Sequence, residues 1–135
     1  MSARLLDSFL VLVAEDDPDT LEIYEAWLPE VIAPIVGART VQILSAPTIT
    51  TVLKYLDDHA RGRCSIDLCL LDGNLPFVPN RPPVPATSLV PYIKHLGIPA
   101  IAAPGDAGRA AEMFDAGCIA KCVKPFGAEE LAVIL

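Results

Sequence analysis

The sequence predicts an α/β fold, an open parallel sheet with helices on both faces. Short apolar runs alternate five times with segments of helical periodicity, and this alternation is typical of parallel strands connected by helices. The runs are apolar throughout, as expected of strands that are covered on both faces. With 135 residues and no detectable repeat, the chain is expected to form a single domain, residues 1–135. Whether it is the N-terminal domain of a longer protein stays open.

The first strand is expected at Phe9–Ala14, an unbroken apolar run that ends at acidic residues. Asp17-Pro18 then predicts a helix start, with the aspartate as N-cap and the proline in the first turn. Pro29 and Pro34 leave the end of this helix undecided, because proline disrupts a helix interior. We expect residues 35–40 to form a connection.

The second and third strands are expected at Val41–Leu44 and Ile66–Leu71. Between them, apolar residues recur at the i, i+3, i+4, i+7 spacing from Ile49, which predicts a helix that stops at Arg61-Gly62. The third strand lies in the most apolar run of the chain and delivers Asp72 to the loop that follows it.

The second half of the chain is richer in turn signals. Residues 77–85 contain several prolines and are expected to be irregular. A helix is expected over about Ala86–His95, and Pro91 inside this pattern predicts a kink or a late start. The fourth and fifth strands are expected at Ile98–Ala103 and Cys118–Val123.

Two further helices are expected after the fourth and fifth strands. Asp106 is expected to cap the first of them, which would carry Ala110, Met113 and Phe114 inward. The second is expected to begin at Gly127, where the apolar pattern resumes.

Composition and charge narrow the function classes. Hydrophobic residues make up 53% of the chain and charged residues 20%, which is too apolar for a disordered protein. The net charge of -7 argues against nucleic-acid binding by this domain, and no stretch is apolar enough to span a membrane. The N-terminus lacks the features of a secretory signal, so the cytoplasm is the expected location. The four cysteines lack zinc-ligand spacing and are expected to be reduced, buried side chains.

Charged residues follow three of the expected strands. The first strand ends at Glu15 and Asp16, the third at Asp72, and the fifth at Lys124. Because parallel strands deliver their carboxyl ends to one edge of a sheet, these side chains are expected to converge. Clustered carboxylates repel unless a cation joins them, and Mg²⁺ suits carboxylates together with phosphate oxygens. Asp72 is then a candidate nucleophile for a phosphoryl group, and Lys124 can pair with it at rest and hold a phosphoryl oxygen after transfer.

Three segments carry these residues, namely Val11–Pro18, Asp72–Pro76 and Lys124–Phe126. In this order they resemble the signatures of the response-regulator receiver domain, the CheY-like family of two-component signalling. The resemblance covers nearly the whole chain. It implies a flavodoxin-like fold, with five parallel strands in the order 2-1-3-4-5.

The resemblance also implies a role for each charged residue. Asp72 would be the phosphoacceptor, which takes a phosphoryl group from the phosphohistidine of a sensor histidine kinase or of a phosphotransfer protein. Asp16 would bind Mg²⁺ directly, Glu15 would bind it through water, and Asn74 would offer its backbone carbonyl. Lys124 would hold the phosphoryl group, and the peptide bond that follows it would be cis. The protein would be a switch that phosphorylates itself rather than a conventional enzyme.

Two positions depart from the family pattern. The fourth strand of a receiver usually ends in Thr or Ser, but counting places Ala102 or Pro104 there, and neither carries a hydroxyl. An aromatic residue usually lies three positions before the lysine, where this chain has Lys121. We therefore expect the phosphorylation chemistry to be retained and the usual response of the last two strands to be lost.

The chain is also longer than the family pattern. The extra residues are expected around Pro29–Thr40, and a proline-rich insertion follows Pro76. This insertion, residues 77–85, follows the expected acidic site directly, where it could cover the site, contact a partner or be a passive surface loop.

Two other functions compete with the phosphoacceptor function. The missing hydroxyl and aromatic ring favour a receiver-like interaction module that works without phosphate, whereas the retained acids and Lys124 oppose it. A phosphatase with an aspartyl-phosphate intermediate ranks last, because such enzymes need a second acid where this chain has Asn74. The kinase, the output and the oligomeric state, including a homodimer, stay open.

Overall fold

The central sheet of the computed structural model is parallel, and its five strands follow the order β2-β1-β3-β6-β7. The structure describes residues 6–135. The strands are β1 (Leu6–Ala14), β2 (Ala38–Ala46), β3 (Leu68–Leu71), β6 (Ala100–Ala102) and β7 (Ala120–Lys121). Counted within this sheet alone, the order is 2-1-3-4-5, which confirms the predicted topology.

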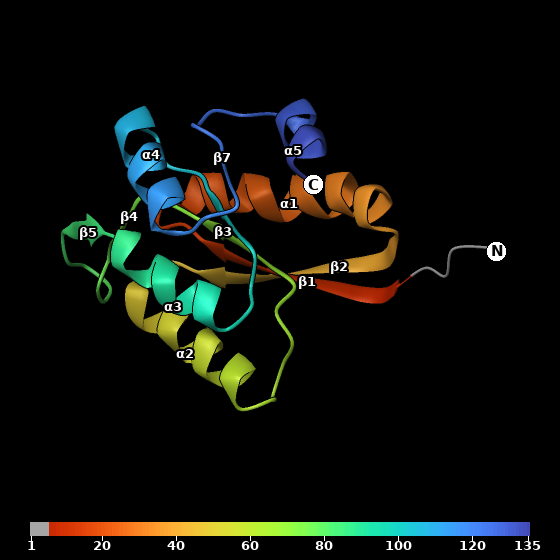
Figure 1. Cartoon of the computed structure of the whole chain (residues 1–135), viewed down its shortest axis with the longest axis horizontal. Helices are drawn as coiled ribbons and strands as arrows, with labels where there is room; N and C mark the ends of the chain where they lie inside the picture. Colours follow the sequence, from red (N-terminus) through yellow and green to blue (C-terminus); the bar gives the residue numbers. More distant parts are fainter. Residues whose placement is uncertain (1–5) are drawn as a thin grey trace.

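Helices cover both faces of the sheet, as predicted. They are α1 (Pro18–Val36), α2 (Ile49–Ala60), α3 (Val90–His95), α4 (Ala107–Ala116) and α5 (Ala128–Ile134). Helices α1 and α5 lie on one face, and α2 and α3 lie on the other together with the buried side of α4 (Figure 1).

The central strands β1 and β3 send alternate side chains to opposite faces. Leu12 and Leu71 lie in the core formed with α2 and α3, while Val11, Val13 and Leu70 lie in the core formed with α1 and α5. None of these side chains is more than 2% exposed. Burial on both faces therefore explains why the strands are apolar without interruption.

Helix α1 continues through Pro29 and Pro34, the two residues that left its end undecided, as far as Val36. Its inward residues Leu28 and Ile32 are each 1% exposed. Their packing against the sheet offsets the hydrogen bonds that the two prolines cannot make. Gly37 then ends the helix in the left-handed conformation, with φ of 70°.

Strand β2 begins directly after this cap, so the expected connection at residues 35–40 is wrong. Leu6 pairs with Ala38 at one end of the ladder, and β1 and β2 are nine residues long each. Residues 29–40, where extra length was expected, form the end of α1 and the start of β2 rather than a loop.

The proline-rich segment belongs to a hairpin: residues 77–82 are its irregular loop, as expected, but residues 83–85 form a strand, which was not expected. Its two strands, β4 (Asn74–Pro76) and β5 (Pro83–Pro85), pair antiparallel and lie apart from the main sheet (Figure 1). The Thr50 N–H donates to the Phe77 carbonyl at 3.1 Å, which ties the hairpin to the first turn of α2.

The spacing of the prolines explains why this hairpin forms. The Ala86 N–H donates to the Gly73 carbonyl at 2.9 Å. In an antiparallel ladder, hydrogen-bonded residue pairs alternate with pairs that make no hydrogen bond. The next hydrogen-bonded pair after Gly73 and Ala86 is therefore Leu75 and Val84. The prolines of β5 fall at the positions between these pairs, where no N–H has to reach the partner strand.

Helix α3 starts late, as Pro91 predicted. A 3₁₀ turn at Thr87–Leu89 precedes it, and the proline lies in its first turn. Strands β6 and β7 are shorter than expected, because only three and two residues of these segments pair as strands.

Helix α4 is capped as predicted by Asp106, whose carboxylate accepts hydrogen bonds from two N–H groups of the first turn. Ala110 and Met113 are buried, but Phe114 is 44% exposed, so the prediction that it points inward is wrong. Phe114 follows Met113 directly and is therefore rotated away from the buried face of the helix. Its ring instead lies beneath the Lys121 ammonium, at 5.5 Å from the ring centroid.

The cysteines are buried as expected, with the exception of Cys64. All four cysteines are free, and three of them are buried, while Cys64 is half-buried. Among the helices of residues 6–135, none is long and apolar enough to cross a membrane.

His59, in the last turn of α2, is hydrogen-bonded to two segments beyond its own helix. Its Nδ1 accepts from the N–H of buried Ile66 at 3.0 Å, so its Nε2 carries the proton and donates to the Leu96 carbonyl at 3.3 Å. In His59→Ala the Ile66 N–H loses its acceptor, and we expect the free energy of unfolding to fall by about 1–3 kcal/mol. Chemical denaturation measures this loss. Exposed His95 provides the control, and an equal loss in His95→Ala would contradict the assignment.

Candidate functional site

Backbone hydrogen bonds hold the ends of four strands together, and the Ala103 N–H, which donates to the Leu71 carbonyl at 2.8 Å, joins β6 to β3. The Asp72 N–H donates to the Ala14 carbonyl at 2.9 Å, which continues the pairing of β3 with β1. The Lys124 N–H donates to the Pro104 carbonyl at 2.8 Å, which continues the pairing of β7 with β6. The residues that follow these strands therefore meet at one edge of the sheet, as the sequence predicted.

Glu15, Asp16 and Asp72 form an acidic cluster, in which one carboxylate oxygen of each residue lies within 4.8 Å of the others. Glu15 is 1% exposed, and the other two are half-buried. The Lys124 Nζ lies 2.6 Å from Glu15 Oε1 and 3.4 Å from Asp72 Oδ1. Lys124 thus pairs with Asp72, as expected, but its shorter contact is with Glu15.

Burial and neighbouring charges shift the pKa values at this site. Burial, together with the Glu15 carboxylate, raises the pKa of Asp72 to about 7, although Lys124 and the Gly73 N–H favour its charged form. Burial is also the main cause of the raised pKa of Asp16. Burial would lower the pKa of Lys124, but its hydrogen bond to Glu15 and the charge of Asp72 raise that pKa above the ordinary value.

Two further residues named from the sequence lie beside the cluster. Asp17 is the N-cap of α1, because its carboxylate accepts from the Asp19 N–H at 3.4 Å and from the Thr20 hydroxyl at 2.6 Å. Asn74 begins β4 between two hydrogen-bonded pairs of the hairpin, so its carbonyl points away from β5 and is not used by the ladder. Its role as a metal ligand stays a prediction. The Lys124-Pro125 peptide bond is cis, as the resemblance implied.

The positions that depart from the receiver pattern lie in or directly after β6 and β7, the two strands beyond β3. Ala102 is buried and pairs with Leu71 and Lys121, and Pro104 follows it at the end of β6. No Ser, Thr or Tyr occurs in residues 100–107, so neither alignment supplies a hydroxyl there. Lys121 is exposed, and its ammonium lies over an aromatic ring of α4.

The sequence did not single out two residues near the cluster. Tyr24 of α1 is 6% exposed, and burial followed by the charges of Glu15 and Asp72 raises the pKa of its hydroxyl. The second residue is Arg109, because a Cβ placed on Gly73 would lie 2.5 Å from its Cγ. No sequence signal connects residues so far apart in the chain.

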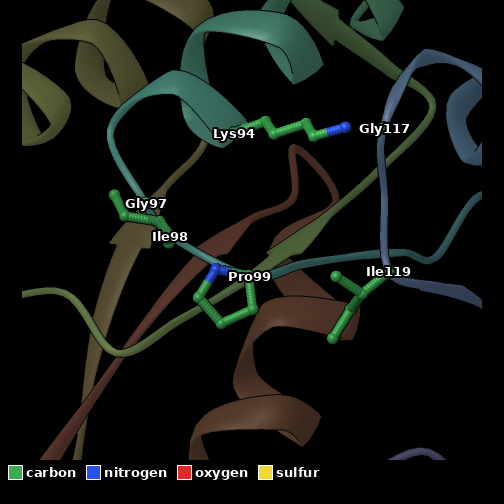
Figure 2. A pocket seen from close by; sticks show the side chains of 6 residues that line it. All are labelled: Lys94, Gly97, Ile98, Pro99, Gly117 and Ile119. Atoms are coloured by element: carbon green, nitrogen blue, oxygen red, sulfur yellow. The ribbon is translucent and has the colours of Figure 1, made fainter.

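Two surface hollows lie outside the cluster. The first has a volume of about 280 Å³ and is lined by Lys94, Gly97, Ile98, Pro99, Gly117 and Ile119 (Figure 2). The residues before β6 and β7 form part of its lining, so it lies at the opposite edge of the sheet from the acids, with the Lys94 side chain extended across it (Figure 2). The second has a volume of about 200 Å³ and is lined by Thr20, Ile23, Tyr24, Lys124, Pro125 and Phe126.

No protein-family model matches the sequence, and a search of curated proteins finds no match. Solved structures of receiver domains nevertheless resemble the chain along most of its length. The receiver domain of a sensor histidine kinase from Pseudomonas aeruginosa, described with a magnesium ion coordinated in its active-site cleft, has a TM-score of 0.70 at 21% identity. The match covers 94% of this chain and 93% of that chain.

Two further structures give similar values. The response regulatory domain of mrkE from Klebsiella pneumoniae has a TM-score of 0.68 at 18% identity, over 93% of this chain and 91% of that chain. The phosphorylated cyanobacterial phytochrome response regulator RcpA has a TM-score of 0.65 at 18% identity, over 94% of this chain and 88% of that chain. The chain therefore has a flavodoxin-like α/β fold. More specifically, it has the fold of response-regulator receiver domains, which confirms the fold that the sequence motifs implied.

Proposed function

We propose that this chain is a phosphoacceptor receiver domain of a two-component system. Asp72 takes a phosphoryl group from the phosphohistidine of a sensor histidine kinase or of a phosphotransfer protein. The observation that carries the proposal is that the acidic cluster and Lys124 meet at the carboxyl edge of a receiver-type sheet. The proposed domain comprises residues 1–135 and acts in the cytoplasm as a switch rather than as a conventional enzyme.

The acidic cluster fits a magnesium ion. Three carboxylates lie close together, and burial and a neighbouring acid raise the pKa of one of them to about 7. A divalent cation would stabilise such carboxylates in their charged form. Glu15, Asp16, Asp72 and the backbone carbonyl of Asn74 would hold it. When bound, Mg²⁺ would supply positive charge that offsets the negative charge of a phosphoryl group.

The chemistry at Asp72 follows from its position. A carboxylate oxygen of Asp72 attacks phosphorus, the new O–P bond forms as the P–N bond to the donor imidazole breaks, and the electron pair returns to the ring nitrogen. Lys124, whose Nζ lies 3.4 Å from Asp72 Oδ1, holds a phosphoryl oxygen. Water later hydrolyses the acyl phosphate, which restores the carboxylate and releases inorganic phosphate.

Magnesium affinity is expected to rise with pH in this protein. Asp72 has a pKa of about 7 and must lose its proton to bind the ion. The apparent dissociation constant should therefore fall by roughly tenfold per pH unit below that pKa and level off above it. Calorimetric titration at several pH values measures this dependence. Asp72→Asn should bind magnesium more weakly and without this slope, and a slope of equal size in that variant would contradict the assignment.

Intact mass spectrometry tests the proposed function. After incubation with Mg²⁺ and a small-molecule phosphodonor, the wild-type protein should gain the mass of one phosphoryl group, and Asp72→Asn should gain none. Asp17→Asn provides a matched control, because Asp17 lies outside the acidic cluster and Asn also serves as an N-cap. No gain in the wild-type protein, or an equal gain in Asp72→Asn, would refute the proposal.

A receiver-like interaction module that works without phosphate is the second candidate. Two observations favour it: residues 100–107 contain no hydroxyl, and the charge of Lys121 lies over Phe114. Such a module has no use for a metal ion. A magnesium titration separates the candidates, because the phosphoacceptor requires binding that depends on Asp72, and the module predicts none.

A further inference from the structure

The side chain of Arg109 lies against the backbone of Gly73, the residue that follows Asp72. A Cβ built on Gly73 would lie 2.5 Å from Arg109 Cγ and 2.7 Å from Pro104 Cβ, so the arginine stem fills the space beside this glycine. The Gly73 N–H in turn donates to Asp72 Oδ1 at 2.7 Å. The flexible Cδ–Nε segment beyond Cγ joins this stem to the guanidinium, whose position the packing against Gly73 does not fix.

The guanidinium has a weak partner when Asp72 is unmodified. Its Nη1 lies 2.6 Å from Oε2 of Glu112, one turn further along α4. The Glu112 side chain is 59% exposed, and ion pairs with such exposed partners contribute little to stability. The backbone of Arg109 is fixed more firmly, since its N–H donates to Asp106 Oδ2 at 3.1 Å. The end of the side chain can therefore change partner without disturbing the helix.

A phosphoryl group on Asp72 would need more donors than the site now offers. It brings nearly two negative charges at neutral pH. Within the described chain, Lys124 is the one basic side chain paired with the acidic cluster, and it is shared between Glu15 and Asp72. Residues 100–107 at the end of β6 add no hydroxyl. Arginine matches a phosphoryl group well, because its planar fork donates two parallel hydrogen bonds.

We propose that Arg109 binds the phosphoryl group on Asp72. When Asp72 is phosphorylated, the guanidinium leaves Glu112 and donates to phosphoryl oxygens. This inference rests on the proposed function of Asp72. Glu112 then competes with the phosphoryl group for Arg109. The contact also couples the first turn of α4 to the phosphorylation of Asp72.

Binding of beryllofluoride, a stable mimic of a phosphoryl group on a carboxylate, tests the inference. Affinity is measured by fluorine NMR at saturating Mg²⁺ for the wild-type protein, Arg109→Gln and Glu112→Gln. Arg109→Gln should weaken binding by about tenfold, which is the loss of affinity expected when one charge-assisted hydrogen bond is removed. Glu112→Gln should bind at least as tightly as the wild-type protein, because it frees Arg109. Arg109→Lys should recover part of the loss.

The two Gln variants are matched controls, since both remove the same ion pair. If Arg109 served only to stabilise α4, both variants would change binding equally, and this result would overturn the inference. Unchanged binding in Arg109→Gln would overturn it as well, while leaving the proposed function of Asp72 intact. If the wild-type protein and Asp72→Asn both fail to bind beryllofluoride, the proposed function fails and the inference fails with it.

The Arg109 Nε–H signal in nitrogen NMR should shift when beryllofluoride is added to the wild-type protein but not to Asp72→Asn.

Discussion

Asp72→Asn is expected to make the magnesium-free protein more stable at pH 8, even though it abolishes phosphorylation. Burial and the Glu15 carboxylate raise the pKa of Asp72 from 3.8 to about 7. The negative charge of Asp72 therefore lowers the free energy of unfolding. A shift of this size corresponds to a gain of up to about 4 kcal/mol when the charge is removed. Asn keeps the volume of the side chain and an oxygen that can accept from the Gly73 N–H.

The pH dependence of this gain has a definite sign. Below pH 3.8 the Asp72 carboxyl is protonated in the folded and the unfolded chain, so the substitution gains nothing there. The gain grows as the pH rises from 3.8 to about 7 and is complete above that value. Urea denaturation in the presence of a chelator measures it at each pH. A variant that is less stable than the wild-type protein at pH 8 would show that the Asp72 charge is not destabilising.

Lys124→Met is expected to lower the free energy of unfolding by about 3 kcal/mol near neutral pH. The Lys124 ammonium lies 2.6 Å from Oε1 of Glu15, and Glu15 is 1% exposed. Without this ammonium, a buried carboxylate remains beside two other acids and no described basic side chain pairs with it. Methionine keeps the apolar stem of the side chain, so the change isolates the charge.

A double variant distinguishes the loss of the Lys124–Glu15 ion pair from a general disruption of packing by the substitution. Glu15→Gln combined with Lys124→Met should recover most of the lost stability, because no unpaired charge then stays buried. Lys121→Met is the matched control: its lysine is exposed in the same segment, and its effect should stay within about 0.5 kcal/mol. Equal losses in Lys121→Met and Lys124→Met would argue against the pairing with Glu15.

The fold could be predicted from the sequence because each central strand is a continuous apolar run with a charged residue at its end. Glu15 and Asp72 mark the ends of β1 and β3, and the topology of a parallel sheet then brings them together. Proline caused two of the difficulties. It left the end of α1 undecided, but packing carries this helix through Pro29 and Pro34. It also hid β5, whose prolines occupy positions that need no N–H.

The candidate site was predicted less completely than the fold. Residues that follow strand ends are visible in the sequence, so the acids and the lysine were named correctly as neighbours. Arg109 and Tyr24 lie on helices, and their approach to the site depends on how those helices pack against the sheet. Helical periodicity gives the buried face of a helix but not the residue that this face meets.

Chemical labelling tests most directly whether Asp72 is the phosphoacceptor. The protein is phosphorylated with Mg²⁺ and a small-molecule donor and then treated with borohydride, which reduces an acyl phosphate to an alcohol and marks the modified residue for peptide mass spectrometry. We predict the mark at Asp72 and at no other acid, with Lys124→Met reducing its yield. A mark at Asp16 or at an acid outside the cluster, with Asp72 unmodified, would contradict the assignment of Asp72 as phosphoacceptor.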